Sequence, residues 1–327
     1  MVDITLDRDQ LHSLRYGSTV VLDDSAVIQL SGPGTLDCLQ SIFTNDVVTP
    51  GDQDLIYGAF LTPKGMIITD SWVLRAAPDP MLILPASRAD RVLELFKRTL
   101  PPRLAQATDL RIHWSVAWLF GENVGSVLET LEQGSEHFVP GSVKMFERPG
   151  GPLFLGAGPS PAPFEAVLLG ETAEVDSLRK QAIADGATLG TSDDWHAARV
   201  LAGWPATESE IGDRTLPQEV RLDLLKGLSH TKGCYTGQET VARLHFRGHT
   251  NKEIRGIRWD GCERLEDHAI MRDEKKLGII HSTLRLPDRT LALGTVRTTV
   301  NVGDHVLVDG QDATVVPLPF LAADIEA

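Results

Sequence analysis

The pattern of apolar and polar residues in the first third of the chain predicts strands that alternate with helices. Residues 26–32 alternate between apolar and polar side chains, as in a strand with one buried face. Within 32–43 the apolar side chains recur three to four positions apart, which predicts a helix. Two strands within 55–75 are expected to pair as an antiparallel hairpin that turns at Pro63–Gly65, and residues 81–87 predict another strand. This mixture is typical of an α+β fold.

Helix signals are clearest between residues 87 and 247. Five segments there have apolar residues at helical spacing, and several begin or end with residues that favour helix termini. Ser87 and Ser192 are expected to cap two of these helices, and Gly186 and Gly203 are expected to end two of them. The predicted helices span residues 87–100, 172–186, 192–203, 217–227 and 238–247.

The pattern changes near residue 252. Short runs rich in β-branched residues follow, separated by glycine and aspartate turns, and no helical spacing is convincing. This pattern predicts a small barrel or sandwich. We therefore expect two domains, an α+β body over residues 1–252 and an all-β domain over residues 253–327. The predicted strands of the second domain lie within 253–259, 276–284, 290–300, 305–310 and 313–318.

Composition and charge narrow the class of protein. The chain has 327 residues, enough for two or three domains, and its 42% apolar and 23% charged residues are ordinary for a globular protein. The net charge of −14 opposes direct binding to nucleic acid or to an anionic membrane. We find no apolar run long enough to span a membrane and no signal peptide at the N-terminus. We expect a soluble protein of a reducing cytoplasm.

Positive charge gathers in one part of this acidic chain, between Arg243 and Arg258. Five lysines and arginines and two histidines occur there. The cluster indicates either a site for a small anion or a solvated helix face. Because His245 and His249 are separated by a helix-breaking glycine, and the three cysteines form no CxxC pair, no metal site is expected.

The stretch KGCYTGQE, residues 232–239, carries the strongest local signal. It has glycines but no lysine at the position that a phosphate-binding P-loop needs, so we reject that interpretation. Its glycines allow a tight turn before the helix predicted from residue 238. Lys232 and the positive end of that helix would favour the thiolate of Cys234. The stretch therefore holds either a reactive cysteine or a small buried apolar side chain.

This stretch, with "TVAR…RG" behind it, resembles the signature of the folate-binding YgfZ-type proteins, relatives of the glycine cleavage T protein, an aminomethyltransferase. Other segments resemble the same family in the same order. They are LSGPGTLDCLQSIFTNDV near the N-terminus, the hairpin GAFLTPKGMIITD, the LPQEVRLDLLKG run before the signature, and LGIIHSTLRLPDRTLALGTV near the C-terminus. The resemblance covers most of the chain, and the KGCYTGQE match is the most specific part.

The resemblance implies a T-protein-like body, made of two interleaved α+β subdomains with a central cleft, and a C-terminal β-barrel. It implies tetrahydrofolate, or a one-carbon derivative, as the ligand. It also implies an accessory role in the assembly or repair of iron–sulfur proteins, including those that modify tRNA. Folate and iron–sulfur proteins or their assembly factors are the expected partners, without direct contact to nucleic acid or membrane.

The resemblance also implies roles for individual residues. Cys234 would be the functional thiol, with Lys232 and Asp70 as further catalytic candidates. Trp195 would offer its indole to the flat pterin ring of the folate. The other residues expected to bind the cofactor are Asn45, Asp46, Glu219, Tyr235, Gln238, Glu239, Arg243 and Arg247, of which the two arginines suit the anionic glutamate tail.

Two positions depart from the aminomethyltransferase pattern. Leu201 stands where those enzymes carry an acid that reads the pterin edge, and Glu219 is a candidate to replace it. Thr69 and Asp70 stand where they carry a pair of aspartates. Both departures argue against a working aminomethyltransferase. Two alternatives to the accessory role stay open, a tetrahydrofolate-dependent one-carbon transferase that uses Asp70, and a module that docks on a protein without binding folate.

Overall fold

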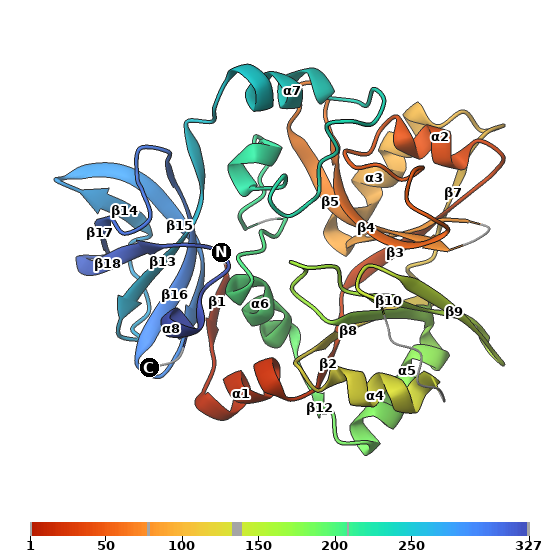
Figure 1. The fold of residues 1–327 in the computed structure, drawn as a ribbon, viewed down its shortest axis with the longest axis horizontal. Coiled ribbons are helices and arrows are strands. Elements are labelled where there is room, and N and C mark those ends of the chain that lie inside the picture. Colours follow the sequence, from red (N-terminus) through yellow and green to blue (C-terminus); the bar gives the residue numbers. More distant parts are fainter. Residues whose placement is uncertain (1, 77–78, 133–138, 208, 326–327) are drawn as a thin grey trace.

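Three β-sheets organise the chain in the computed structural model, which describes residues 2–76, 79–132, 139–207 and 209–325 (Figure 1). Two sheets with their helices lie to the right in Figure 1, and a barrel of blue strands lies to the left. The predicted α+β class with mixed and antiparallel sheets and a C-terminal barrel is confirmed. The described residues contain no helix that is both long enough and apolar enough to cross a membrane.

The first sheet has five antiparallel strands. Their order is β4 (Gln53–Leu61), β5 (Ile67–Ala76), β6 (Met81–Pro85), β3 (Ser25–Ser31) and β7 (Gln106–Asp109). The hairpin predicted within 55–75 is therefore confirmed as β4 and β5. Helices α2 (Thr35–Gln40) and α3 (Ala86–Thr99) cover this sheet, and Phe96 of α3 packs edge to face on Phe60 of β4.

The second sheet has six strands and its own pair of helices. The strand order is β12 (Thr188–Leu189), β2 (Thr19–Asp23), β8 (Trp114–Phe120), β11 (Ala166–Glu171), β10 (Gly151–Ala157) and β9 (Val143–Arg148). Helices α4 (Val124–Glu132) and α5 (Thr172–Ala184) pack on this sheet and share one hydrophobic core with it. In that core, Val175 and Leu178 of α5 lie with Leu168 of β11. Gly186, with a φ of 101°, follows the end of α5 as predicted.

Six strands near the C-terminus close into a barrel. Neighbouring strands pair around the ring, and the last pairing, between β15 and β16, closes it. The ring order is β15 (Lys275–Arg285), β14 (Ala269–Arg272), β17 (His305–Val308), β18 (Gln311–Val316), β13 (Lys252–Asp260) and β16 (Arg289–Arg297). The N-terminal strand β1 (Val2–Thr5) adds to β15 in parallel, with Val2 opposite Ser282.

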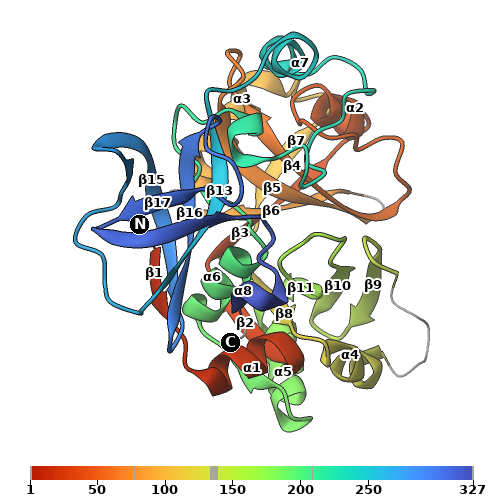
Figure 2. The same ribbon diagram turned by 60° about the vertical axis from the view of Figure 1, so that its left-hand side comes forward.

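Helix α6 (Ser192–Leu201) lies between the barrel and the six-stranded sheet in both ribbon views (Figures 1 and 2). It buries Ala197, Ala198 and Val200 in the central core. The predicted cap was wrong by one residue. Thr191, not Ser192, precedes the helix, and its hydroxyl donates a 3.0 Å hydrogen bond to Asp194.

Two more local predictions were wrong. The helix expected over 217–227 is a single 3-10 turn, η1 (Pro217–Val220), because Arg221 and Lys226 take left-handed backbone conformations, with φ of 60° and 58°. Ser87 does not cap α3, which begins one residue earlier, after Pro85. The helix predicted at 238–247 is confirmed as α7 (Gln238–Arg247). The remaining helices are α1 (Arg8–Tyr16) and α8 (Ala322–Ile325).

Candidate functional site

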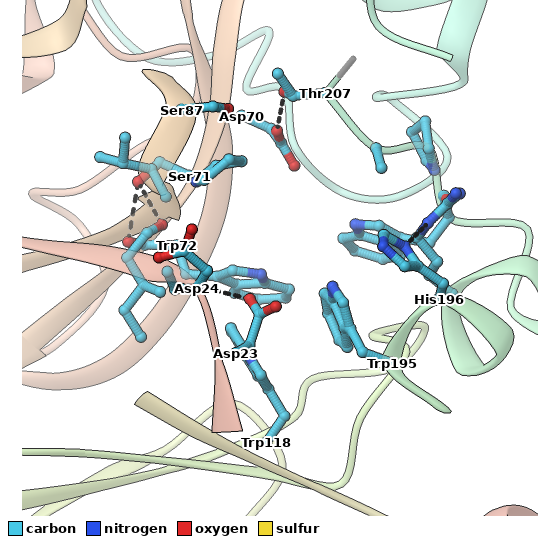
Figure 3. A pocket seen from close by; sticks show the side chains of 18 residues that line it. Asp23, Asp24, Asp70, Ser71, Trp72, Ser87, Trp118, Trp195, His196 and Thr207 are labelled. Carbon is cyan, nitrogen blue, oxygen red and sulfur yellow. Dashed lines mark hydrogen bonds between the residues drawn. The ribbon is translucent and has the colours of Figure 1, made fainter. Parts of the chain in front are cut away.

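A cavity of about 210 Å³ lies where β2, β5, β8 and α6 meet (Figure 3). Asp70 of β5 and Trp195 of α6 both line it, although more than a hundred residues separate them in the chain. Two residues that the sequence singled out for different reasons therefore share one site. We refer to this space as the central cavity.

Tryptophan side chains form much of the wall of the central cavity. Trp195 stacks on Trp118 of β8, with ring centroids 4.9 Å apart and planes inclined by 13°. Trp72 of β5 stacks on Trp204, with centroids 5.7 Å apart. Tyr57 of β4 packs on both Trp72 and Trp204 and closes the wall behind them. Such a wall offers aromatic faces to a flat ring system.

Carboxylates supply the polar part of the central cavity. The Tyr57 hydroxyl donates a 3.0 Å hydrogen bond to Asp70. The Thr207 hydroxyl donates one of 2.9 Å to the same carboxylate, which Figure 3 shows as a dashed line. Burial raises the pKa of Asp70, while these two hydrogen bonds oppose the rise by favouring the charged form. Burial also raises the pKa of Asp23, which accepts a 2.6 Å hydrogen bond from Ser25. Each carboxylate keeps lone pairs for further donors.

A buried polar network supports the α6 side of the central cavity. Arg199 donates to His196 Nδ1 at 3.1 Å and to Glu210 at 3.0 Å. Ser282 of the barrel accepts from Arg199 at 2.7 Å and donates to Glu210 at 2.5 Å. Burial, followed by the charge of Arg199, lowers the pKa of His196 to about 4, so this imidazole is neutral at physiological pH. The network fixes the helix that presents Trp195.

The residues present fit a pterin. A pterin is a flat heteroaromatic ring that carries an amino group and a ring N–H. Its ring stacks on an aromatic face, and its two N–H donors need a hydrogen-bond acceptor. Trp195 offers the face and Asp70 the acceptor, and both line the central cavity. Asp70 thus provides a carboxylate in the cavity that Trp195 lines, although Leu201 stands where the family resemblance leads us to expect an acid. Leu201 itself lines a different cavity, beside Tyr16 and Phe164.

The signature KGCYTGQE lies away from the central cavity lining. The Lys232 ammonium donates to three backbone carbonyls, those of Gln40 at 2.7 Å, Phe43 at 2.6 Å and Asn45 at 2.8 Å. These three bonds use every donor of the group. Burial lowers its pKa to about 8, while Asp46 opposes this shift. Lys232 therefore fastens the signature to the segment that carries Asn45 and Asp46, and its predicted catalytic role stays a prediction.

Asn45 and Asp46 are also engaged with the backbone. The Asn45 amide donates to the carbonyls of Tyr57 and Lys226, at 2.8 and 2.7 Å. The Asp46 carboxylate accepts hydrogen bonds from the backbone N–H groups of Val48 and Thr49, both at 3.0 Å. Burial acts to raise the pKa of Asp46, but its hydrogen bonds together outweigh burial and lower the pKa to about 2. Both residues line a cavity of about 250 Å³ that shares Trp72 and Trp204 with the central cavity.

The remaining signature residues differ in exposure. Cys234 and Glu239 are exposed, and Gln238 is half-buried at the start of α7. Tyr235 is buried beneath the Lys232 ammonium, which lies 5.0 Å from its ring centre, and burial raises its pKa to about 12. Gly237 takes a φ of 84° before α7, as the expected tight turn requires. Nearby, the half-buried imidazole of His230 stacks on the exposed imidazole of His245.

The predicted cofactor-binding residues thus occupy several places. Arg243 and Arg247 are exposed on α7. Glu219 accepts a 3.0 Å hydrogen bond from the backbone N–H of Leu216, just before η1, and lies 3.7 Å from Lys252. It lines a cavity beside the barrel rather than the central cavity. The basic stretch is divided between α7 and β13, and two of its arginines are paired with acids, Arg255 with Glu253 and Arg258 with Asp324.

Sequence reasoning missed much of the central cavity. Asp23, Trp72, Trp118 and Trp204 were not singled out, nor was Tyr57 behind them. One signal was present, since four of the six tryptophans of the chain line this cavity. Ligand pockets are lined mainly by hydrophobic and aromatic side chains, so this gathering of tryptophans marks the central cavity as a candidate site.

Comparisons with known proteins agree with this architecture. Residues 19–146 match the family model described as the GCVT N-terminal domain. The tRNA-modifying protein YgfZ of Serratia proteamaculans (strain 568) is 27% identical over 316 residues, 93% of each chain. YgfZ of Escherichia coli O157:H7 (strain EC4115 / EHEC) is 27% identical over 321 residues, 92% of each chain.

A solved structure extends the likeness to the whole fold. The aminomethyltransferase T of the glycine cleavage system from Bartonella henselae superposes with a TM-score of 0.79 and covers 96% of this chain and 89% of its own. Its sequence identity is 16%, so the match concerns the fold. The resemblance predicted from KGCYTGQE is therefore confirmed: the chain is similar to the tRNA-modifying YgfZ proteins over almost its whole length, and it has the fold of the glycine cleavage T protein.

Proposed function

We propose that this protein binds a reduced folate, tetrahydrofolate or a one-carbon derivative, with the pterin ring in the central cavity. The observation that carries the proposal is the meeting of Trp195 and Asp70 in one cavity walled by tryptophans. Trp195 would stack on the pterin, and Asp70 would accept hydrogen bonds from its amino edge. The T-protein-like fold supports the same ligand class.

We further propose an accessory role in tRNA modification, through the assembly or repair of iron–sulfur proteins. The similarity to tRNA-modifying YgfZ proteins supports the first part. The net charge of −14 disfavours direct contact with tRNA, so the protein would act on protein clients rather than on the nucleic acid. Cys234 is exposed, so its thiol is accessible to a partner or an oxidant.

Calorimetric titration with tetrahydrofolate and with 5-formyltetrahydrofolate tests the folate site. The variants are Trp195→Leu and Asp70→Asn, and the matched control is Trp114→Leu, which removes a partly buried indole that stacks on Phe154 outside the central cavity. We expect saturable binding that the first two variants weaken about tenfold or more and the control leaves unchanged. Absence of saturable binding would contradict the folate proposal and favour the docking alternative.

Complementation of cells that lack the protein tests the role of the cysteine. Cys234→Ala is compared with Cys262→Ala, because both thiols are exposed. We expect the first variant to reduce the activity of an iron–sulfur enzyme and the level of thiolated tRNA under oxidative stress. The second variant should restore both. Equal restoration by the two variants would remove Cys234 from the mechanism.

A specific observation also favours a second candidate function, a tetrahydrofolate-dependent one-carbon transferase. Asp70 is a carboxyl group with a raised pKa inside the cavity, which suits proton transfer to or from a bound folate. Formation of methylene- or methyltetrahydrofolate from an amine or sulfonium donor, lost in Asp70→Asn, would support it. No turnover across such donors, with folate binding intact, would leave the accessory role.

A further inference from the structure

A second cavity, of about 440 Å³, lies between the barrel and the segment that carries Glu210 and η1. Three cationic side chains line it, Lys252 of β13, Lys276 of β15 and Arg297 of β16. They come from three strands that are adjacent in the barrel. We refer to this space as the basic cavity.

Two of these cations face each other directly. Lys252 and Arg297 are opposite partners in the antiparallel pairing of β13 and β16, so their side chains leave the sheet on the same face. Like charges directly opposite each other destabilise a sheet. An anion bound between them would remove this repulsion.

Of the three cations, the acids around the basic cavity pair only with Lys252. Glu210 forms a buried ion pair with Arg199, with Oε2 and Nη1 3.0 Å apart. Glu219 forms an ion pair with Lys252, with Oε2 and Nζ 3.7 Å apart. Lys276 and Arg297 are exposed and form no ion pair with any residue in the described ranges of the chain. Two positive charges therefore remain uncompensated at this cavity, in a protein whose net charge is −14.

The basic cavity is separate from the central cavity. Arg199 lines the central cavity and Glu210 lines the basic cavity, so their buried ion pair stands between the two spaces. On the basic side, His281 shares a 2.8 Å hydrogen bond with Thr295, and Val220 and Leu277 add apolar surface.

We propose that the basic cavity binds a small phosphate ester. A phosphate monoester carries close to two negative charges and three terminal oxygens, which match two uncompensated cations and a third donor in Lys252. The guanidinium of Arg297 can hold two of these oxygens in a forked geometry, and Lys276 adds a point charge. The organic part would pack on Val220 and Leu277. A polynucleotide is disfavoured because it needs an extended basic surface on a protein that is acidic overall.

Calorimetric titration of the full chain with inorganic phosphate, glycerol 3-phosphate and succinate tests this site. The variants are Lys276→Gln and Arg297→Gln. The control is Lys275→Gln, which removes an exposed charge from the same strand outside the cavity lining. We expect both phosphates to bind saturably, about tenfold more weakly in each cavity variant and unchanged in the control. Succinate, whose carboxylates are farther apart, should bind more weakly than either.

Three results would overturn the proposal: no saturable binding of either phosphate, equal effects of Arg297→Gln and Lys275→Gln, or tighter binding of succinate than of glycerol 3-phosphate. The side-chain NMR signals of His281 give a second readout, because a bound dianion would raise the pKa of this neighbouring imidazole. Unchanged His281 signals at saturating phosphate would place the anion elsewhere. Since the altered side chains are exposed, thermal unfolding of the variants should match that of the wild type.

Discussion

Arg199 and Glu210 form an ion pair from which water is almost excluded. The Nη1 atom of Arg199 lies 3.0 Å from Oε2 of Glu210, and the exposed side-chain fractions are 1% and 0%. Ser282 of the barrel bonds to both partners. The pair therefore joins α6, the loop that carries Glu210 and the barrel at one point, and it forms the partition between the two cavities.

Breaking this pair should be among the most destabilising changes to the chain. Arg199→Met leaves a buried carboxylate without its cation, which costs about 3–5 kcal/mol in the free energy of unfolding. Arg98→Met removes an exposed pair with Glu94 and should cost less than about 1 kcal/mol. Urea unfolding measures both. A cost for Arg199→Met no larger than that for Arg98→Met would mean that Glu210 finds other partners or takes up a proton.

Lys232→Met tests whether this lysine has a structural role. The variant leaves three backbone carbonyls without their donor, so we expect a loss of roughly 3 kcal/mol, about one for each hydrogen bond. Lys226→Met is a suitable control, because Lys226 makes one exposed bond to the carbonyl of Ser160. If Lys232→Met unfolds like the wild type but loses function, the predicted catalytic role gains support over the structural one.

Two glycines of the signature should respond very differently to alanine. Gly237 has a φ of 84°, and a Cβ there would lie 2.7 Å from the carbonyl oxygen of Thr62 and 3.1 Å from the Cα of Gly65. Gly237→Ala should therefore destabilise the protein by at least about 1–2 kcal/mol. Around Gly233 a Cβ would meet nothing within 4 Å. Gly233→Ala should change the unfolding midpoint little, and equal effects would show that the hairpin can move away from α7.

The stability of the protein should depend on pH through His196. Its pKa is about 4 in the folded state and 6.5 when unperturbed, so between these values the unfolded chain binds a proton that the folded chain does not. The free energy of unfolding should therefore fall as the pH falls from 6.5 towards 4. His196→Gln should reduce this dependence, as measured by urea unfolding across that range. An unchanged slope would assign the dependence to His230 and His281, whose pKa values burial also lowers.

The sequence predicted those parts of the fold that local patterns determine. The hairpin of β4 and β5 could be read because a short turn at Pro63–Gly65 joins two contiguous apolar runs. The helix expected at 217–227 failed, although Pro217 favours a helix start, because the left-handed backbone at Arg221 and Lys226 depends on tertiary contacts. One such contact is the 2.9 Å bond from Arg221 to the carbonyl of Leu318 in the distant C-terminal segment.

Two residues of the candidate site were predicted individually, but their assembly into one cavity was not. Asp70 and Trp195 each stood out through the family resemblance, Asp70 after the glycine of the hairpin and Trp195 on the helix predicted at 192–203. Their shared cavity depends on how two sheets and α6 pack, which no local pattern encodes. The same reason hid the basic cavity. Lys252 and Arg297 become neighbours through the register of β13 and β16, and nothing in the spacing between them indicates that pairing.

The parallel pairing of β1 with β15 has a consequence for synthesis in the cell. Val2 leaves the ribosome long before its partner Ser282, because all the residues between them must be made first. The N-terminal strand must therefore wait unpaired while both other sheets form, and its pairing adds a contact of very long sequence separation late in folding. A domain fused before Val2 would therefore hinder the late pairing of β1 with β15. A domain fused after helix α8 would leave β1 free to pair.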